Sequence, residues 1–262
     1  MENVHIESTK DIALRLIKKD KWIVAGVCFV GFVFLFFIPQ IGAAIVAAII
    51  MYYFVKAHDE FMSNFARAHG MTYTEEGAIE DCNGRLFEIG ENRGVKNVVA
   101  GTWNNFPIKI FNYSYTTGSG KSRSTPMFTV LEISFDQVEF PFIFLRSKKV
   151  WGLRLSYEIN DVDVSLHGRR FKLSVAKGYE IEALQIFSEE LLDYLTQNVP
   201  EFSIEFSKNK INIFKLGLVG SKKTLTSLLD TGKHIIDSSG PFISRLSDDF
   251  AALHPYYSDK NY

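Results

Sequence analysis

The longest apolar run in the chain covers residues 22–55 and contains no charged side chain. One straight helix of this length would measure about 51 Å, well beyond a bilayer core of about 30 Å. Pro39 lies near the middle of the run, where its missing backbone donor favours the end of a helix. The pattern predicts a transmembrane helical hairpin over residues 22–56, built from helices 22–38 and 41–56. A re-entrant hairpin and one kinked span are the alternatives.

Basic residues flank this run on both sides, while the turn at its centre carries no charge. They are Arg15, Lys18, Lys19 and Lys21 before it, and Lys56 and Arg67 after it. Because basic flanks favour the cytoplasm, a hairpin places both flanks there, whereas a single span would leave one set outside. We therefore expect an integral protein of the cell membrane with its soluble domain in the cytoplasm. A cleaved signal peptide is disfavoured, since its apolar region would be about 7–15 residues long.

Residues 1–21 form an N-terminal amphipathic segment in which Ile12, Ala13, Leu16 and Ile17 recur at helical spacing. Lysines surround this stripe, so the segment fits a helix lying on anionic lipid and an ordinary solvated helix equally well. Beyond Lys56 the second membrane helix is expected to continue to His69, where Gly70 provides a natural C-cap.

Residues 57–240 are predicted to form a soluble α+β domain, with a C-terminal tail over 241–262. Val95–Trp103 and Phe106–Tyr115 read as two strands joined by the turn Asn104-Asn105. Further strands are expected at 126–135, 140–145, 161–165, 171–175, 202–207 and 210–216. Helices are expected at 180–199 and at 222–237, the second capped by Ser221. The short connections favour an antiparallel meander, so the domain should hold a mainly antiparallel sheet with two to three helices.

Three segments carry a resemblance to a known group of proteins. They are Phe65–Tyr73, Asn97–Trp103 and Phe111–Lys121, with a further similar element at Arg169–Leu173. The chain resembles an uncharacterised family of bacterial membrane-anchored proteins over about residues 61–199. The resemblance implies one or two N-terminal transmembrane helices and a single α+β domain, and it implies no activity. His167-Gly168 departs from the family pattern, which usually has Phe-Asn there.

Composition narrows the possible functions. The formal net charge is −1, whereas a dedicated nucleic-acid binder normally has a basic excess, so no nucleic-acid partner is expected. Cys28 and Cys82 are the two cysteines, and Cys28 lies inside the apolar run, which disfavours a disulfide. Two cysteines at this distance form no zinc pattern. No metal and no cofactor are predicted.

The strongest candidate contact site is a basic segment with a tryptophan and no acid. It consists of Arg146, Lys148, Lys149, Trp151 and Arg154, and Lys121 and Arg123 would join it if the two loops lie together. Basic residues beside an exposed tryptophan suit anionic lipid head groups. The competing interpretation is a solvated loop whose tryptophan belongs to the core.

Other motifs are weaker. Gly118–Ser122 resembles the end of a phosphate-binding loop, but Tyr115 replaces the required glycine and a strand follows. A polar cluster could form from His167, Arg169, Arg170, Asp161 and Asp163, although no nucleophile accompanies it. His58 and His69 lie on similar helix faces without a third ligand, so they make a poor metal site.

The prediction for function is a membrane-tethered, non-enzymatic binding or scaffold module whose partner is a protein or anionic lipid. One alternative is a membrane-associated enzyme of unknown reaction centred on residues 167–170. The other is a structural subunit of a larger membrane complex, in which Gly26, Gly31 and the small residues at 42–44 and 47–48 permit close helix packing.

Overall fold

The structure is a computed structural model, which describes residues 6–37, 39–135, 138–150, 159–162 and 170–253. The chain divides into two compact units. One contains Met1–Tyr73 together with Gly220–Thr224, and the other contains Thr74–Val219 with Leu225–Tyr262. Each unit is described by itself.

The first unit is built from three helices, α1 (Thr9–Lys19), α2 (Lys21–Phe37) and α3 (Pro39–Ala68). Helix α1 packs against α3, and Ile12 on its apolar side is fully buried. The Arg15 guanidinium reaches Glu60 of α3 at 2.6 Å and Glu7 at 3.1 Å. The contact with α3 shows that the apolar side of α1 is covered by protein, which favours the second interpretation of this segment.

Helices α2 and α3 run antiparallel and pack along one another. Gly31 lies in the contact, where an added Cβ would come within 3.3 Å of the Val46 side chain. Glycine therefore lets the two helices approach closely. Helix α3 is long and apolar enough over Gln40–Ala68 to cross a membrane, whereas α2 is shorter, Lys21–Phe37.

The predicted end of α3 is confirmed. Gly70 adopts a φ of 66°, a left-handed conformation that glycine adopts without steric cost. The Met71 amide donates to the Ala66 carbonyl at 2.9 Å, and the Gly70 amide donates to the Arg67 carbonyl at 3.3 Å. These two bonds form a Schellman motif, which satisfies carbonyls that a helix end would otherwise leave unpaired.

The second unit contains a nine-stranded sheet in the order β1-β2-β3-β4-β9-β8-β5-β7-β6, and every pairing from β2 to β6 is antiparallel. The strands are β1 Thr72–Gly77, β2 Glu91–Trp103, β3 Phe106–Thr116, β4 Met127–Ser134, β5 Phe140–Ser147, β6 Ile159–Val162, β7 Phe171–Ala176, β8 Ser203–Lys208 and β9 Lys210–Leu216. The mainly antiparallel α+β fold is thus confirmed. Asn104 and Asn105 both have positive φ, as a tight hairpin turn requires.

The strand order differs from the predicted meander. Strands β4 and β5 follow one another in sequence, yet the β8–β9 hairpin lies between them and pairs with both. Local turn signals could not reveal this insertion, because the hairpin follows the helical region and pairs across a long sequence separation.

The helices also exceed the predicted two to three. The helix expected over 180–199 is two helices, α4 (Glu180–Ile186) and α5 (Glu189–Asn198). Ser188 begins α5, because its hydroxyl accepts a bond from the Leu191 amide at 3.4 Å. Helix α6 (Lys222–Leu253) continues beyond the predicted end at Asp237. Three short 3-10 helices, η1 (Ile79–Asp81), η2 (Arg85–Glu88) and η3 (Gly120–Ser122), were not expected.

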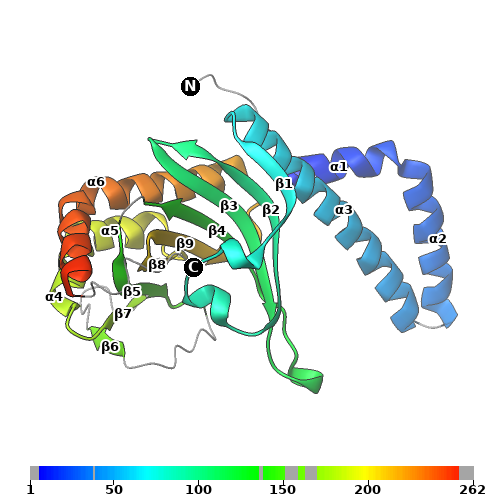
Figure 1. The fold of residues 1–262 in the computed structure, drawn as a ribbon. Helices are drawn as coiled ribbons and strands as arrows, with labels where there is room; N and C mark the ends of the chain where they lie inside the picture. Colours follow the sequence, from blue (N-terminus) through cyan, green and yellow to red (C-terminus); the bar gives the residue numbers. More distant parts are fainter. Residues whose placement is uncertain (1–5, 38, 136–137, 151–158, 163–169, 254–262) are drawn as a thin grey trace. The chain divides into compact units, whose positions relative to one another are not determined.

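The two faces of the sheet are covered differently (Figure 1). Helix α6 lies on one face, where an added Cβ at Gly232 would come within 2.8 Å of Ile133. The opposite face is crossed by the segment between β1 and β2. Leu86 and Phe87 of this segment are buried in a cluster with Phe111 and Tyr113. This second face carries the polar groups described next.

Candidate functional site

A row of polar side chains crosses the middle of the sheet on the face opposite α6. Cross-strand pairing places Lys109 of β3 beside Glu132 of β4, Glu132 beside Asn212 of β9, and Asn212 beside Glu205 of β8. Directly paired residues lie on the same face, so these four side chains form one line. Glu132, Asn212 and Glu205 are at most 1% exposed.

Residues 78–90, which we call the strap, cover this row. The Asp81 carbonyl accepts from Lys210 Nζ at 2.9 Å, and the Asn83 carbonyl accepts from Asn212 Nδ2 at 2.7 Å. Gly84 has a φ of 142°, and an added Cβ would come within 2.8 Å of Asn212 Nδ2. The strap is therefore held by bonds between its own backbone and side chains of the central strands.

Glu132 and Lys210 form a buried ion pair, with Lys210 Nζ 2.7 Å from Glu132 Oε1. Burial raises the pKa of Glu132, while the Lys210 and Lys109 ammonium groups oppose this shift. The second carboxylate oxygen, Oε2, has no hydrogen-bond partner. A buried ion pair adds little to folding stability compared with a pair of apolar side chains of similar volume. Removing only one partner is strongly destabilising, because the other charge is then buried without a partner.

Glu205 differs from Glu132 because the described residues provide no ion-pair partner for it. Its oxygens accept from the backbone amides of Arg85 and Leu86, at the start of η2. Burial raises the pKa of Glu205 to about 7, against the opposing effect of these two bonds. A carboxyl group whose pKa is raised on folding stabilises the fold fully below its ordinary pKa, and this contribution is lost as pH rises towards 7.

Cys82 and Tyr113 lie at the edge of the row. Burial raises the pKa of the Cys82 thiol to about 12, and it raises the pKa of the Tyr113 phenol. Because the thiolate is the nucleophilic form of cysteine, Cys82 is poorly suited to covalent catalysis.

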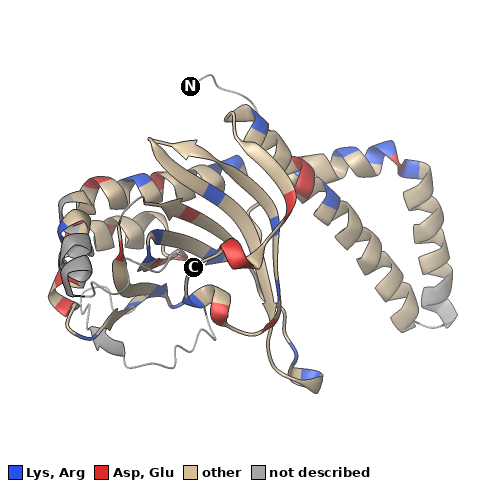
Figure 2. Cartoon of the chain, viewed as in Figure 1, with Lys and Arg blue, Asp and Glu red and all other residues tan. Residues whose placement is uncertain are grey.

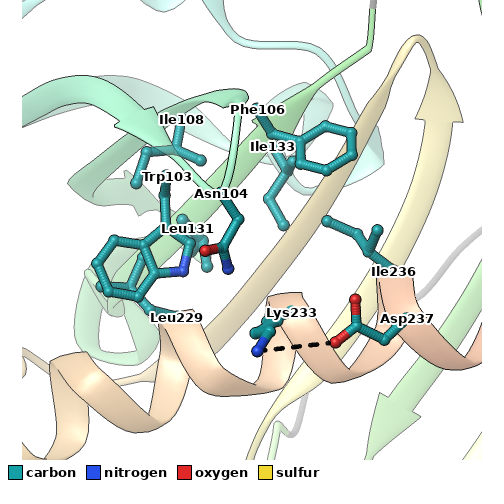
Figure 3. A pocket seen from close by; sticks show the side chains of 10 residues that line it. All are labelled: Trp103, Asn104, Phe106, Ile108, Leu131, Ile133, Leu229, Lys233, Ile236 and Asp237. Carbon is teal, nitrogen blue, oxygen red and sulfur yellow. Dashed lines mark ion pairs between the residues drawn. The ribbon is translucent and has the colours of Figure 1, made fainter.

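A small cavity of about 80 Å³ lies between α6 and the sheet (Figure 3). The β2–β3 turn, strands β3 and β4 and helix α6 all contribute to its lining, which consists of Trp103, Asn104, Phe106, Ile108, Leu131, Ile133, Leu229, Lys233, Ile236 and Asp237. Lys233 and Asp237 stand 4.0 Å apart, and both are more than half exposed. The cavity is on the other side of the sheet from the strap.

The predicted basic residues occupy two loops at one end of the sheet. Lys121 and Arg123 lie on the exposed β3–β4 loop, which Thr117 and Ser124 close by two backbone bonds of 2.9 Å. Arg146 is the last but one residue of β5, and Lys148 and Lys149 are exposed in the turn after the strand. Trp151 and Arg154 lie outside the described residues.

Strands β9 and β8 separate the two basic loops, since β4 carries one and β5 the other. With about 4.8 Å between neighbouring strands, the strands that carry the loops stand roughly 14 Å apart. The two loops could contact the same extended surface, but the sheet does not bring them together into one pocket.

The weaker motifs gain no support from the structure. The Gly118–Ser122 segment forms part of a loop before strand β4, without the α-helix that a phosphate-binding loop requires. His58 is buried, and the His69 ring lies 4.2 Å from the Phe65 ring in a tilted arrangement. Among the described residues, no group of three or more His, Cys, Asp or Glu side chains could hold a metal ion. His167 and Asp163 lie outside the described residues.

No protein-family model matches this chain, and no curated protein matches it. Among solved structures, the chain is similar to the crystal structure of the mycobacterial trehalose monomycolate transport factor A, TtfA. The TM-score is 0.51 at 15% sequence identity, and the match covers 68% of this chain and 94% of that chain. At this identity the similarity shows a shared fold. The resemblance to bacterial membrane-anchored proteins stays a prediction.

We predict that Lys210→Met destabilises the full-length protein in detergent by about 3–5 kcal/mol, because Glu132 is left buried without its partner. The double variant Lys210→Met, Glu132→Leu should recover most of this loss, since it removes both charges. The measurement is denaturant-induced unfolding of the two single variants and the double variant. If the double variant lost as much unfolding free energy as the two single variants lose in sum, the pair would not be coupled.

Proposed function

We propose that this protein is a membrane-tethered, non-enzymatic binding module that serves a transport process. The observation that carries the proposal is the exposure of large apolar side chains along α2 and the first half of α3. Phe29 on α2 is 68% exposed, and Ile50 on α3 is 62% exposed. Figure 2 shows no charged residue along the described part of α2 beyond Lys21 or along the first half of α3, where the first charged residue is Lys56.

Exposed apolar surface of this extent is unfavourable in water and marks contact with a membrane or a protein. A helix satisfies its own backbone hydrogen bonds, so it can lie in lipid without water. The proposal is therefore that α2 and the first half of α3 form the transmembrane hairpin. Trp22 at 81% exposure and Tyr52 at 59% exposure would then lie near the head groups, where amphipathic rings are favoured.

The charges at the helix ends support a cytoplasmic position for both ends. Lys18 and Lys19 end α1, Lys21 begins α2, and Lys56 follows the apolar part of α3. The hydroxyl of Tyr53 donates to Asp20 at 3.1 Å, and Arg15 pairs with Glu60. These contacts join α1 to α3 at the level where the charges begin, so the basic residues would lie on one side of the membrane.

The proposal of a binding role rests on the chemistry of the second unit. Its acidic side chains with shifted pKa values, Glu132 and Glu205, are buried beneath the strap, and each is bonded to protein groups. Lys121, Arg123, Lys148 and Lys149, in contrast, are exposed. With Arg146, Trp151 and Arg154 they are our candidates for contact with anionic lipid head groups or an acidic protein surface.

The structural neighbour adds the transport context of the proposal. TtfA is described as a transport factor. We extend this kind of role to the present chain and propose that it binds another component of a transport process without catalysing a reaction.

The tether can be tested by extraction from membranes. We expect the full-length protein to stay with bacterial membranes through an alkaline carbonate wash and to be released by detergent. Phe29→Lys with Ile50→Lys should release it, because a lysine at the centre of a membrane helix costs about 2.5–3.5 kcal/mol. Phe29→Leu with Ile50→Leu is the matched control and should stay. Carbonate release of the unaltered protein would contradict the tether.

The contact residues can be tested on a fragment comprising residues 57–262 with vesicles that contain phosphatidylserine. We expect Lys148→Glu with Lys149→Glu to weaken binding by about 2 kcal/mol or more, roughly 30-fold, because each basic residue contributes about 1 kcal/mol at an anionic surface. Lys96→Glu with Lys177→Glu makes the same change in net charge away from both loops and serves as the control. Equal binding by both double variants would rule out a lipid contact at this turn.

A further inference from the structure

We propose that Glu205 holds a proton beneath the strap and that release of this proton to solvent loosens the strap from the sheet. This inference is independent of the membrane tether. It concerns a part of the fold that the proposed function does not use, and it makes the covering of the sheet face dependent on pH.

The first step is the orientation of the Asn212 amide. Asn212 Nδ2 donates to the Asn83 carbonyl at 2.7 Å. A carbonyl oxygen only accepts, so the amide nitrogen has to face Asn83, and the amide oxygen Oδ1 has to point elsewhere. That oxygen is buried and has no hydrogen-bond partner. A buried acceptor without a donor is costly, so the row lacks a hydrogen at this point.

The second step is the position of Glu205 relative to this amide. Asn212 and Glu205 are directly paired across β8 and β9. A Cβ added at Gly84 would lie 2.8 Å from Asn212 Nδ2 and 3.0 Å from Glu205 Oε2, so the amide and the carboxyl group flank the same point. The amide atom at this point is Nδ2, a donor. Glu205 Oε2 itself accepts only a long bond, 3.5 Å, from the Leu86 amide, so it is the oxygen that is left to carry a proton. The other oxygen, Oε1, would keep its bond from the Arg85 amide.

The third step is the charge around Glu205 in each state. Several elements around Glu205 carry titratable or charged groups. These are Glu80, Asp81, Cys82, Arg85 and Glu88 of the strap, Lys109, Tyr113 and Tyr115 of β3, Glu132 of β4, Arg146 of β5, Lys208 of β8, and Lys210 and Lys215 of β9. Arg85 pairs with Glu88 at 2.7 Å, and Lys210 pairs with Glu132. Ionised Glu205 would therefore add a second buried negative charge to a row whose one buried ammonium is already paired.

The consequence follows from linkage. In a loosened strap Glu205 meets water and its pKa returns towards the ordinary value, whereas burial beneath the closed strap raises that pKa to about 7. The closed strap therefore binds the proton more tightly than the open strap does. Rising pH between these two values favours opening, and falling pH favours closure.

The test is hydrogen exchange of the strap amides in the full-length protein in detergent, expressed as protection factors. We expect the protection of residues 79–89 to fall on the order of 10-fold between pH 5.5 and 8.5. Glu205→Gln should remove this dependence, because a glutamine side chain is neutral at every pH and its oxygen can still accept from the Arg85 amide. Glu88→Gln is the matched control in the strap and should keep the dependence.

Two results would overturn the proposal. One is strap protection in the unaltered protein that does not change over this pH range. The other is an unchanged pH dependence in Glu205→Gln. Should that variant not fold, infrared spectroscopy of the Lys210→Met, Glu132→Leu variant with isotope-labelled glutamate decides the question, because this variant lacks Glu132, whose pKa is also raised. A protonated carboxyl band that persists at pH 6 supports the proposal, and full ionisation at that pH contradicts it.

Discussion

The constraint on which the first unit depends is the incompatibility between water and the uncharged run at residues 22–55. Most apolar side chains of α2 and the first half of α3 are not covered by protein, and several of the largest are more than half exposed. A soluble helix would present a polar face there. The flanking charges and the Gly31 contact between α2 and α3 support the proposal that this run lies in a membrane.

In the second unit, the two faces of the sheet are covered by different structures. Helix α6 covers one face, and the strap covers the other. Helix α6 provides apolar side chains and packs closely through Gly232. The strap provides backbone amides and carbonyls, and these require polar partners wherever they are buried. Glu205, Asn212 and Lys210 supply those partners from the central strands. The strap therefore needs the polar row, because the row bonds the buried backbone groups of the strap. The proposed protonation of Glu205 would in turn affect how tightly the strap is held.

Much of this architecture could be predicted from local sequence patterns. The uncharged run, the helix end at Gly70, the Asn104-Asn105 turn and the cap at Ser221 each depend on a few neighbouring residues, and the structure contains all of them. The insertion of β8–β9 between β4 and β5 could not be predicted, because it is a long-range pairing. The break at Ser188 was missed because the apolar stripe of 180–199 continues across it.

The polar row was missed for a related reason. Glu132, Glu205 and Asn212 each stand alone among apolar neighbours in a strand, which is what the solvated face of an ordinary strand looks like. Their burial depends on a strap more than 40 residues away in sequence from the nearest of them. In contrast, the basic residues at 121, 123, 148 and 149 were found because exposure is the usual state of such residues.

Membrane topology tests the central claim most directly. A compartment-sensitive reporter would be fused after Tyr262 and, separately, after Gln40, in intact bacterial cells. The account predicts a cytoplasmic signal at Tyr262 and an external signal at Gln40, because two crossings return the chain to its starting side. An external signal at Tyr262 would contradict it and would assign α2 and α3 to a single crossing.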